Sequence, residues 1–218
     1  MEPRVNKNYI WLYFLSFYSL WCIRELWFVQ YIDLMDSVLN AIISAIIKII
    51  IWILPVILIV RTVEKQNVLS YLGLRDHYKK GLIWTVWGTT ALILYFFILN
   101  LIVLENDIGF NLSINELLNT VLLVGITEEI VFRGFLLRKL MDSNSFWQAN
   151  ILTSLLFVSI HFPIWIYKGL FELPYILASM ATAFVLGIIF GFIYRKSNSL
   201  WSVIILHSLY NFLVSIYY

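Results

Sequence analysis

Long apolar runs dominate the chain, and short polar segments separate them. A helix that crosses a lipid bilayer needs about 20 mostly apolar residues. By that measure, the pattern predicts seven membrane-spanning helices, at 9–28, 38–60, 81–104, 117–137, 147–166, 173–194 and 200–217. The apolar runs are continuous and do not alternate with a period of two, which argues against a transmembrane barrel. We therefore expect an all-α, polytopic transmembrane helix bundle.

The first two predicted spans contain interruptions. Arg24 and Glu25 lie near the end of the first run, and Pro55 lies inside the second. A proline removes a backbone donor and tends to kink a helix. The first run follows basic residues, but no cleavage site of small residues comes after it. We therefore interpret this run as an uncleaved signal anchor.

Composition narrows the class of protein. Of the 218 residues, 61% are hydrophobic and 13% are charged, whereas a soluble domain has about 25% charged residues. The mean hydropathy is +0.86. These values exclude a cytosolic globular enzyme, a disordered chain, a coiled coil and a nucleic-acid binder. The single cysteine, Cys22, rules out an intrachain disulfide and a cysteine metal cluster.

The positions of lysine and arginine predict the orientation. With the N-terminus in the cytoplasm, the outer segments hold only Arg24 and Lys168. The cytoplasmic segments then hold eleven basic residues: Arg4, Lys7, Arg61, Lys65, Arg75, Lys79, Lys80, Arg138, Lys139, Arg195 and Lys196. Because basic residues concentrate on the cytoplasmic side, we expect a multi-pass protein of the cell membrane with a cytoplasmic N-terminus.

Small residues recur every four positions in the sixth predicted span, at Ser179, Ala183, Gly187 and Gly191. Such a stripe lies on one side of a helix and lets a neighbouring backbone approach closely. It predicts a packing seam and is not evidence for a ligand.

Ionisable residues inside the spans are the informative ones, because each costs a few kcal/mol to insert. The fourth span contains Glu128, Glu129 and Arg133, and the second contains Lys48, to which we assign no role. Glu129 and Arg133 are four residues apart and can form an ion pair along the helix. Glu128 is then left without a local partner, and with access to water it can serve as a general base. The alternative is that both carboxylates only pair with Arg133 and hold helices together.

The fifth and seventh spans contribute imidazole and amide groups. His161 ends an apolar stretch, and His207 and Asn211 project from one face of the last span. Taken singly, His161 is compatible with a buried core histidine, and the His207–Asn211 pair with hydrogen bonding between helices. At about 1.5 Å per residue, however, Glu128, His161 and His207 all reach the cytoplasmic half of the bilayer.

This set of side chains fits two kinds of hydrolytic site. An acid and a histidine can hold and deprotonate a water, while a second histidine and an asparagine can stabilise an oxyanion. These four side chains suit peptide hydrolysis by direct attack of water. The rival is a zinc site with Glu128, His161 and His207 as ligands, although the chain lacks a His-Glu-x-x-His motif.

The order of these residues resembles a known family. Glu128-Glu129-x-x-x-Arg133, Phe157-x-x-x-His161 and His207-x-x-x-Asn211 follow one another in consecutive apolar segments. They are similar to the three motifs of the CPBP family, the CAAX proteases and bacteriocin-processing enzymes that are also called the Abi family. Gly134 also fits the first motif, and the motif region covers 117–216. We divide the chain accordingly into N-terminal spans with their loop, 1–116, and a catalytic core, 117–218.

The resemblance implies an intramembrane endopeptidase whose active-site cavity lies within the membrane and opens to the cytoplasm. Glu128 would activate the water with help from His161, and His207 with Asn211 would form the oxyanion site. Glu129, Arg133 and Phe157 would support the site. The family is glutamate-dependent, which implies that no metal cofactor is needed. The partners would be the bilayer and a membrane-associated peptide or protein, with bacteriocin immunity or peptide maturation as the expected setting.

Two other functions stay open at this point. A non-catalytic immunity or scaffold protein would bind a peptide or a membrane partner without cleaving it. A small transporter would use Glu128 and Arg133 as a relay, but no inverted repeat or pair of broken helices is evident in the sequence.

Overall fold

The computed structural model describes residues 9–75, 77–105 and 107–217, and this part of the chain is helical with no strand. Five helices are long and apolar enough to cross a membrane: Ser37–Thr62, Tyr78–Val103, Phe146–Tyr167, Tyr175–Ser197 and Leu200–Tyr217. The all-α membrane bundle is therefore confirmed, but the count of seven spans is not. The predicted spans 9–28 and 117–137 are helical as well, and ionisable residues interrupt the apolar run in both.

Several long, continuous helices, here called rods, combine α-helical segments with π-helical segments, which are labelled η. The N-terminal half consists of α1 (Tyr9–Ile23), η1 (Arg24–Phe28), α2 (Val29–Ile32), α3 (Ser37–Lys48), η2 (Ile49–Ile53), α4 (Leu54–Thr62), α5 (Val68–Leu72), α6 (Tyr78–Phe96) and η3 (Phe97–Val103). The C-terminal half consists of η4 (Glu116–Leu122), α7 (Leu123–Glu129), η5 (Ile130–Leu137), α8 (Arg138–Leu140), α9 (Phe146–Ser159), α10 (Phe162–Tyr167), α11 (Tyr175–Ser197) and α12 (Leu200–Tyr217).

Local sequence explains where several helices begin and end. Asp36 accepts hydrogen bonds from the first backbone N–H groups of α3, and Ser145 with Gln148 forms a capping box at the start of α9. Gly73 ends α5 with φ of 76°, a conformation that glycine adopts without strain. Pro55 lies at the start of α4, directly after the π-helical η2.

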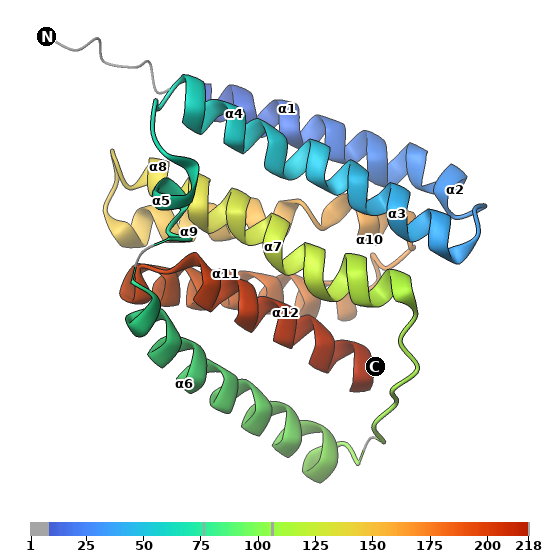
Figure 1. Cartoon of the computed structure of the whole chain (residues 1–218). Coiled ribbons are helices and arrows are strands. Elements are labelled where there is room, and N and C mark those ends of the chain that lie inside the picture. Colours follow the sequence, from blue (N-terminus) through green and yellow to red (C-terminus); the bar gives the residue numbers. More distant parts are fainter. Residues whose placement is uncertain (1–8, 76, 106, 218) are drawn as a thin grey trace, which may run out of the picture.

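The rod formed by η4, α7, η5 and α8 runs through the middle of the bundle (Figure 1). One layer beside it contains α1 and the α3–α4 rod, and α11, α12 and then α6 lie on the opposite side. The closest neighbours include α9 with α11, α12 with α6, and α12 with α7. Segments that lie far apart in sequence therefore enclose the rod that carries Glu128.

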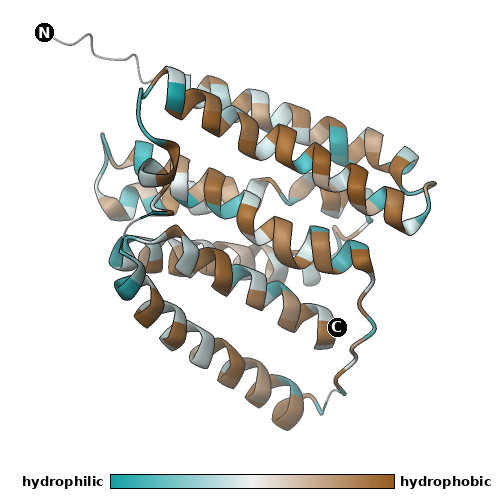
Figure 2. Cartoon of the chain, viewed as in Figure 1, coloured by the Kyte–Doolittle hydropathy of each residue, from teal (hydrophilic) through white to brown (hydrophobic). Residues whose placement is uncertain are grey.

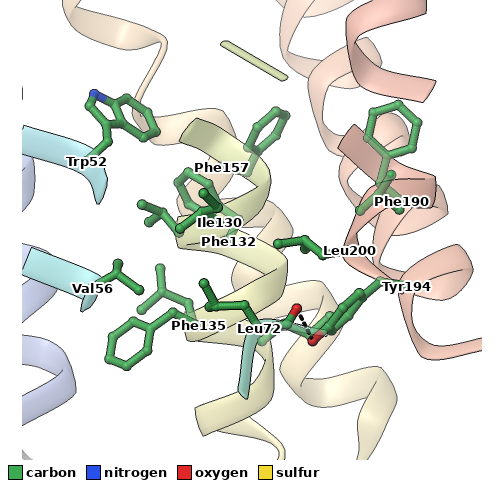
Figure 3. Close-up of a cluster of buried hydrophobic side chains, with 14 of the residues drawn as sticks. Trp52, Val56, Leu72, Ile130, Phe132, Phe135, Phe157, Phe190, Tyr194 and Leu200 are labelled. Atoms are coloured by element: carbon green, nitrogen blue, oxygen red, sulfur yellow. Dashed lines mark hydrogen bonds between the residues drawn. The ribbon is translucent and has the colours of Figure 1, made fainter. Parts of the chain in front are cut away.

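The core is centred on η5, from which every side chain is buried. Trp52 and Val56 pack on one side of it, and Phe190, Tyr194 and Leu200 pack on the other (Figure 3). The Tyr194 hydroxyl also donates to the backbone carbonyl of Leu72 at 3.3 Å. This close packing surrounds η5, which directly follows Glu128 and Glu129. It therefore limits how far the two glutamates can move.

The predicted seam on α11 is confirmed over most of its length. A Cβ on Gly187 would lie 2.8 Å from the Cβ of Ser154, and one on Gly191 would lie 1.9 Å from the Oδ1 of Asn150. Ala183 is buried as well. Ser179 is exposed, so the prediction was wrong for that position. The seam is therefore the contact between α11 and α9.

Glu25 and Lys48 are the buried charged residues of the first two rods, and each has a partner. The first rod continues to Ile32, past the predicted end at residue 28. It does so because Arg24 pairs with the buried Glu25 at 2.6 Å and also donates to Ser44 at 3.3 Å. Lys48 donates to the backbone carbonyl of Asn119 at 2.6 Å. This contact gives Lys48 a packing partner on η4, which the sequence did not predict.

The two ends of the bundle differ in charge, whereas apolar residues predominate along the helices (Figures 1 and 2). At the end where α4 ends, α6 begins and α11 ends, the chain carries the acidic Glu64 and Asp142 and nine basic residues: Arg61, Lys65, Arg75, Lys79, Lys80, Arg138, Lys139, Arg195 and Lys196. At the end where α2 ends and η4 begins, it carries Lys168 and the acidic residues Asp33, Asp36, Glu105, Asp107, Glu116 and Glu172. Arg4 and Lys7, which belong to the predicted cytoplasmic set, lie outside the described residues.

Candidate active site

Glu128 and Glu129 end α7, where the rod changes from α-helix to the π-helical η5. Both are buried, with 6% and 0% of their surface exposed. The predicted ion pair is present, because an N–H of Arg133 donates to Oε1 of Glu129 at 2.7 Å. π-helical turns within α-helices occur frequently at functional sites.

Arg133 is fixed by more than its ion pair. A second N–H donates to the backbone carbonyl of Gly187 at 3.1 Å. Its guanidinium lies 4.7 Å from the ring centre of Phe157 and 5.6 Å from that of Phe190. Rings at these distances attract a cation through their quadrupole. A buried ion pair is favourable only where further contacts offset its desolvation, and the carbonyl and two rings supply such contacts.

His207 joins the last helix to this pair. Its Nδ1 lies 2.8 Å from Oε1 of Glu129, the oxygen that also accepts from Arg133. An ionised carboxylate only accepts hydrogen bonds, so Nδ1 carries the proton in this contact. Nε2 is then the ring atom that faces Glu128, at 3.8 Å from its Oε2. Glu129 thus orients the imidazole toward the second carboxylate.

The carboxylate of Glu128 is buried but not fully paired. Among the described residues, its Oε2 has no hydrogen-bond partner. The 3.8 Å to His207 is too long for a direct hydrogen bond. A separation of this size allows one small polar molecule to contact both atoms. The gap between Glu128 and His207 is therefore the place in this cluster where a hydrolytic water can bind.

The ring of Phe157 contacts the imidazoles of both His161 and His207. The ring centre of Phe157 lies 5.1 Å from that of His161 and 6.0 Å from that of His207. His161 Nδ1 contacts the backbone carbonyl of Phe157 at 2.9 Å. Within the described part of the chain, His207 is the imidazole that lies within 4 Å of the Glu128 carboxylate. The family resemblance implied that His161 helps Glu128 to activate the water, and this role stays a prediction.

Asn211 lies one turn beyond His207, and its side-chain amide donates to the backbone carbonyl of Thr120 at 2.9 Å. The preceding carbonyl, of Asn119, accepts from Lys48. Both carbonyls belong to the π-helical η4, so Lys48 and Asn211 hold this segment from two sides. Asn211 therefore makes a structural hydrogen bond to η4, in addition to any hydrogen bond that it donates to an oxyanion.

The rival zinc reading needed Glu128, His161 and His207 around one ion. Searched across residues 9–75, 77–105 and 107–217, the structure brings no three His, Cys, Asp or Glu side chains close enough to hold a metal. The proposal below uses no metal.

Two residues of this cluster were not predicted from the sequence as site residues. Phe190 lies 5.4 Å from the His207 ring, and the backbone of Gly187 binds Arg133. Gly187 was visible only as part of the packing stripe. Phe190 carried no signal, because it is one of 16 phenylalanines and stands in an apolar run.

Phe190 also forms a wall of an apolar groove of about 660 Å³ between α6, α11 and α12. Leu206, which precedes His207, lines the same groove. Its other lining residues are mostly apolar: Gly88, Ala91, Leu92, Tyr95, Phe96, Leu99, Ala181, Thr182, Val185, Leu186, Ile189, Ile193, Tyr210 and Val214. The cluster therefore adjoins a space that suits an apolar ligand.

Comparison with known proteins supports this picture for the C-terminal half. Residues 110–213 match the model of the Type II CAAX prenyl endopeptidase Rce1-like family. This stretch is similar to the CAAX-protease family. The resemblance predicted from the three motifs is confirmed, and the matched stretch includes all seven predicted site residues. The match indicates peptidase activity in a multi-pass membrane protein. Neither a curated protein nor a solved structure matched the chain.

Proposed function

We propose that this CAAX-protease-like chain is a glutamate-dependent intramembrane endopeptidase. The observation that carries the proposal is the buried, unpaired Oε2 of Glu128, which faces Nε2 of an imidazole at 3.8 Å. A carboxylate without a partner is expensive in an apolar interior. Its retention next to an oriented histidine is what a water-activating site requires.

In the proposed reaction, a water held between Glu128 and His207 attacks the carbonyl carbon of the peptide. Glu128 takes a proton from the water as the C–O bond forms, and this proton then passes to the leaving amine as the C–N bond breaks. Hydrogen bonds from His161 or Asn211 stabilise the oxyanion in between, while Nε2 of His207 accepts a hydrogen bond from the water. Glu129 and Arg133 hold His207 in place beside Glu128, and they do not contact the substrate.

We propose a peptide or protein with an apolar, membrane-embedded segment as the substrate. The groove between α6, α11 and α12 supports this choice, because it is apolar and shares Phe190 with the site. Maturation of a membrane-bound peptide, or immunity to a bacteriocin, would supply such a substrate. We further propose that the protein lies in the cell membrane with its N-terminus in the cytoplasm.

The test is cleavage by the full chain in nanodiscs, followed by mass spectrometry. The probes are a farnesylated peptide that ends in a CAAX sequence and a set of unmodified peptides with apolar segments. We expect Glu128→Gln to slow cleavage by about 10²–10⁴-fold, since that is the range for the loss of a general base.

Glu116→Gln is the matched control, because this carboxylate starts the same rod but is exposed. The backbone N–H and hydroxyl of Ser113 donate to Glu116 and lower the pKa of its carboxyl, so it is ionised under the same assay conditions. Its replacement should change the rate by less than about twofold, as for an ordinary surface position. Full cleavage by a folded Glu128→Gln protein would refute the mechanism. Retained protection without any cleavage by the unaltered chain would favour a binding-only immunity protein.

A further inference from the structure

A second pocket, of about 690 Å³, lies at the basic end of the bundle and has a polar lining. Three connections meet there: the segment after α5, the loop between α8 and α9, and the loop between α11 and α12. The lining residues are Ser70, Gly73, His77, Arg138, Met141, Asp142, Asn144, Phe146, Tyr194, Arg195 and Asn198. The pocket contains none of the predicted catalytic residues.

The charge of this pocket favours an anion. Arg138 and Arg195 contribute two guanidinium groups, and His77 contributes an imidazole. The carboxylate in the lining, that of Asp142, lies 2.8 Å from Nζ of Lys139, which also lies 3.1 Å from Glu64. The described lining therefore holds two guanidinium groups and one carboxylate, at the place where the chain leaves the apolar part of the bundle.

Arg138 is held in place before any ligand arrives. Its guanidinium donates to the backbone carbonyl of Tyr71 and lies 4.6 Å from the centre of the Tyr71 ring. An arginine has five N–H donors in a fixed plane, so the contact with Tyr71 leaves donors for an oxygen in the pocket. Hydroxyl and amide groups of Ser70 and Asn198 line the same space. Two planar cations with nearby neutral donors match the oxygens of a phosphate group.

We propose that this pocket binds a phosphate group, as carried by an anionic phospholipid headgroup or by a free phosphate. The position at the end of the spanning helices suits a headgroup, because apolar residues predominate along the adjoining helices (Figure 2). Basic pockets between transmembrane helices bind lipid headgroups in this way. The proposal does not depend on the proposed peptidase activity.

The test measures lipid retention by native mass spectrometry and thermal unfolding, with the full chain in detergent. The probes are phosphatidylglycerol, phosphatidylcholine and inorganic phosphate. We expect the unaltered chain to retain phosphatidylglycerol in preference to phosphatidylcholine, and Arg195→Gln to weaken that retention by about tenfold. Arg195 is exposed, so its replacement should leave the fold intact.

Lys196→Gln is the matched control, since this neighbouring cation lies 5.5 Å from the Phe192 ring and does not line the pocket. It should change retention by less than twofold. Stabilisation by inorganic phosphate that depends on Arg195, without preference among the lipids, would identify a soluble phosphate as the source. Equal effects of the two substitutions, or no stabilisation by any of the probes, would overturn the proposal.

Discussion

Each of the ionisable residues at the candidate site has a different environment, although all lie in the same apolar rod or beside it. Glu129 is shared by Arg133 and His207, at 2.7 and 2.8 Å. Each of the two carboxylates has an Oε2 without a hydrogen-bond partner among the described residues, but that of Glu128 lies 3.8 Å from Nε2 of His207. Neighbouring positions on a helix point about 100° apart, so two identical side chains acquire different tasks. One positions the histidine, and the other is available for chemistry.

Arg133→Met tests the positioning role. The replacement leaves Glu129 buried without its cation, so we expect the free energy of unfolding to fall by about 3–5 kcal/mol. Unfolding in mixed micelles is the measurement. Arg61→Met, at an exposed position of α4, is the control and should change stability by less than about 0.5 kcal/mol. Adding Glu129→Gln to Arg133→Met should recover part of the loss, because the unpaired charge is then removed. A double variant that loses the sum of the two single effects would contradict the ion-pair account.

A chelator separates the water mechanism from the zinc alternative. Because the proposed reaction uses only carboxylate, imidazole and amide side chains, 1,10-phenanthroline should leave the cleavage rate unchanged. The measurement is the rate of probe cleavage before and after chelation, with a zinc protease in parallel as the positive control. Inhibition that added Zn²⁺ reverses would show that a metal takes part.

The residue-level prediction from the sequence worked where spacing within one helix decides the contact. Glu129 and Arg133 are four residues apart, and this separation fixes their pairing. The contact between His207 and Glu129 crosses two helices that are 78 residues apart in sequence. Such a contact depends on helix rotation and depth, which no local pattern encodes. For the same reason, the sequence did not predict that His207 is the imidazole next to Glu128.

At the level of elements, close contact between α9 and α11 supports the site, because Gly187 binds Arg133 and also packs on Ser154. The stripe of small residues predicted the seam on α11 but not its partner. The predicted boundaries were less accurate where a polar residue interrupted a run. Arg24 and Glu25 were expected near a helix end, yet their mutual pairing allows the rod to continue to Ile32.

Gly191→Ala tests the seam, because the added Cβ would overlap with Oδ1 of Asn150. The two helices must separate or Asn150 must move, and we expect a loss of about 1–3 kcal/mol in unfolding free energy. Asn150→Ala alone removes the hydrogen bond from its amide to the carbonyl of Ile188. The double variant should be less destabilised than the sum of the single variants, since the clash is then absent. Strict additivity would indicate that the two positions do not meet.

At the level of the whole molecule, the asymmetry of lysine and arginine predicted which loops share an end. The structure gathers the basic residues of four connections at the same end of the bundle (Figure 1). Length and composition predicted an all-helical membrane bundle, because lipid leaves few other ways to satisfy backbone polar groups. The depth of packing around η5 could not be predicted, since each helix in the bundle is apolar on most of its surface.

Cysteine labelling tests the orientation. Cys22 is the sole cysteine of the chain, so Cys22→Ser gives a background for single-cysteine variants. Gln66, between α4 and α5, and Asn111, between η3 and η4, are exposed. Figure 1 shows these two connections at opposite ends of the bundle. In intact cells, we expect an impermeant maleimide to label Asn111→Cys and to leave Gln66→Cys unlabelled until the membrane is opened. The reverse pattern would place the basic end outside.

The separation of charge between the two ends also has an electrical consequence. A membrane potential that is negative on the cytoplasmic side contributes about 2.3 kcal/mol per elementary charge per 100 mV of voltage crossed. Because one end carries more cations than carboxylates and the other carries more carboxylates than cations, this voltage favours the same orientation at both ends. In an energised cell, the predicted orientation is therefore the one that the field itself favours, and reversing the molecule would require work against it.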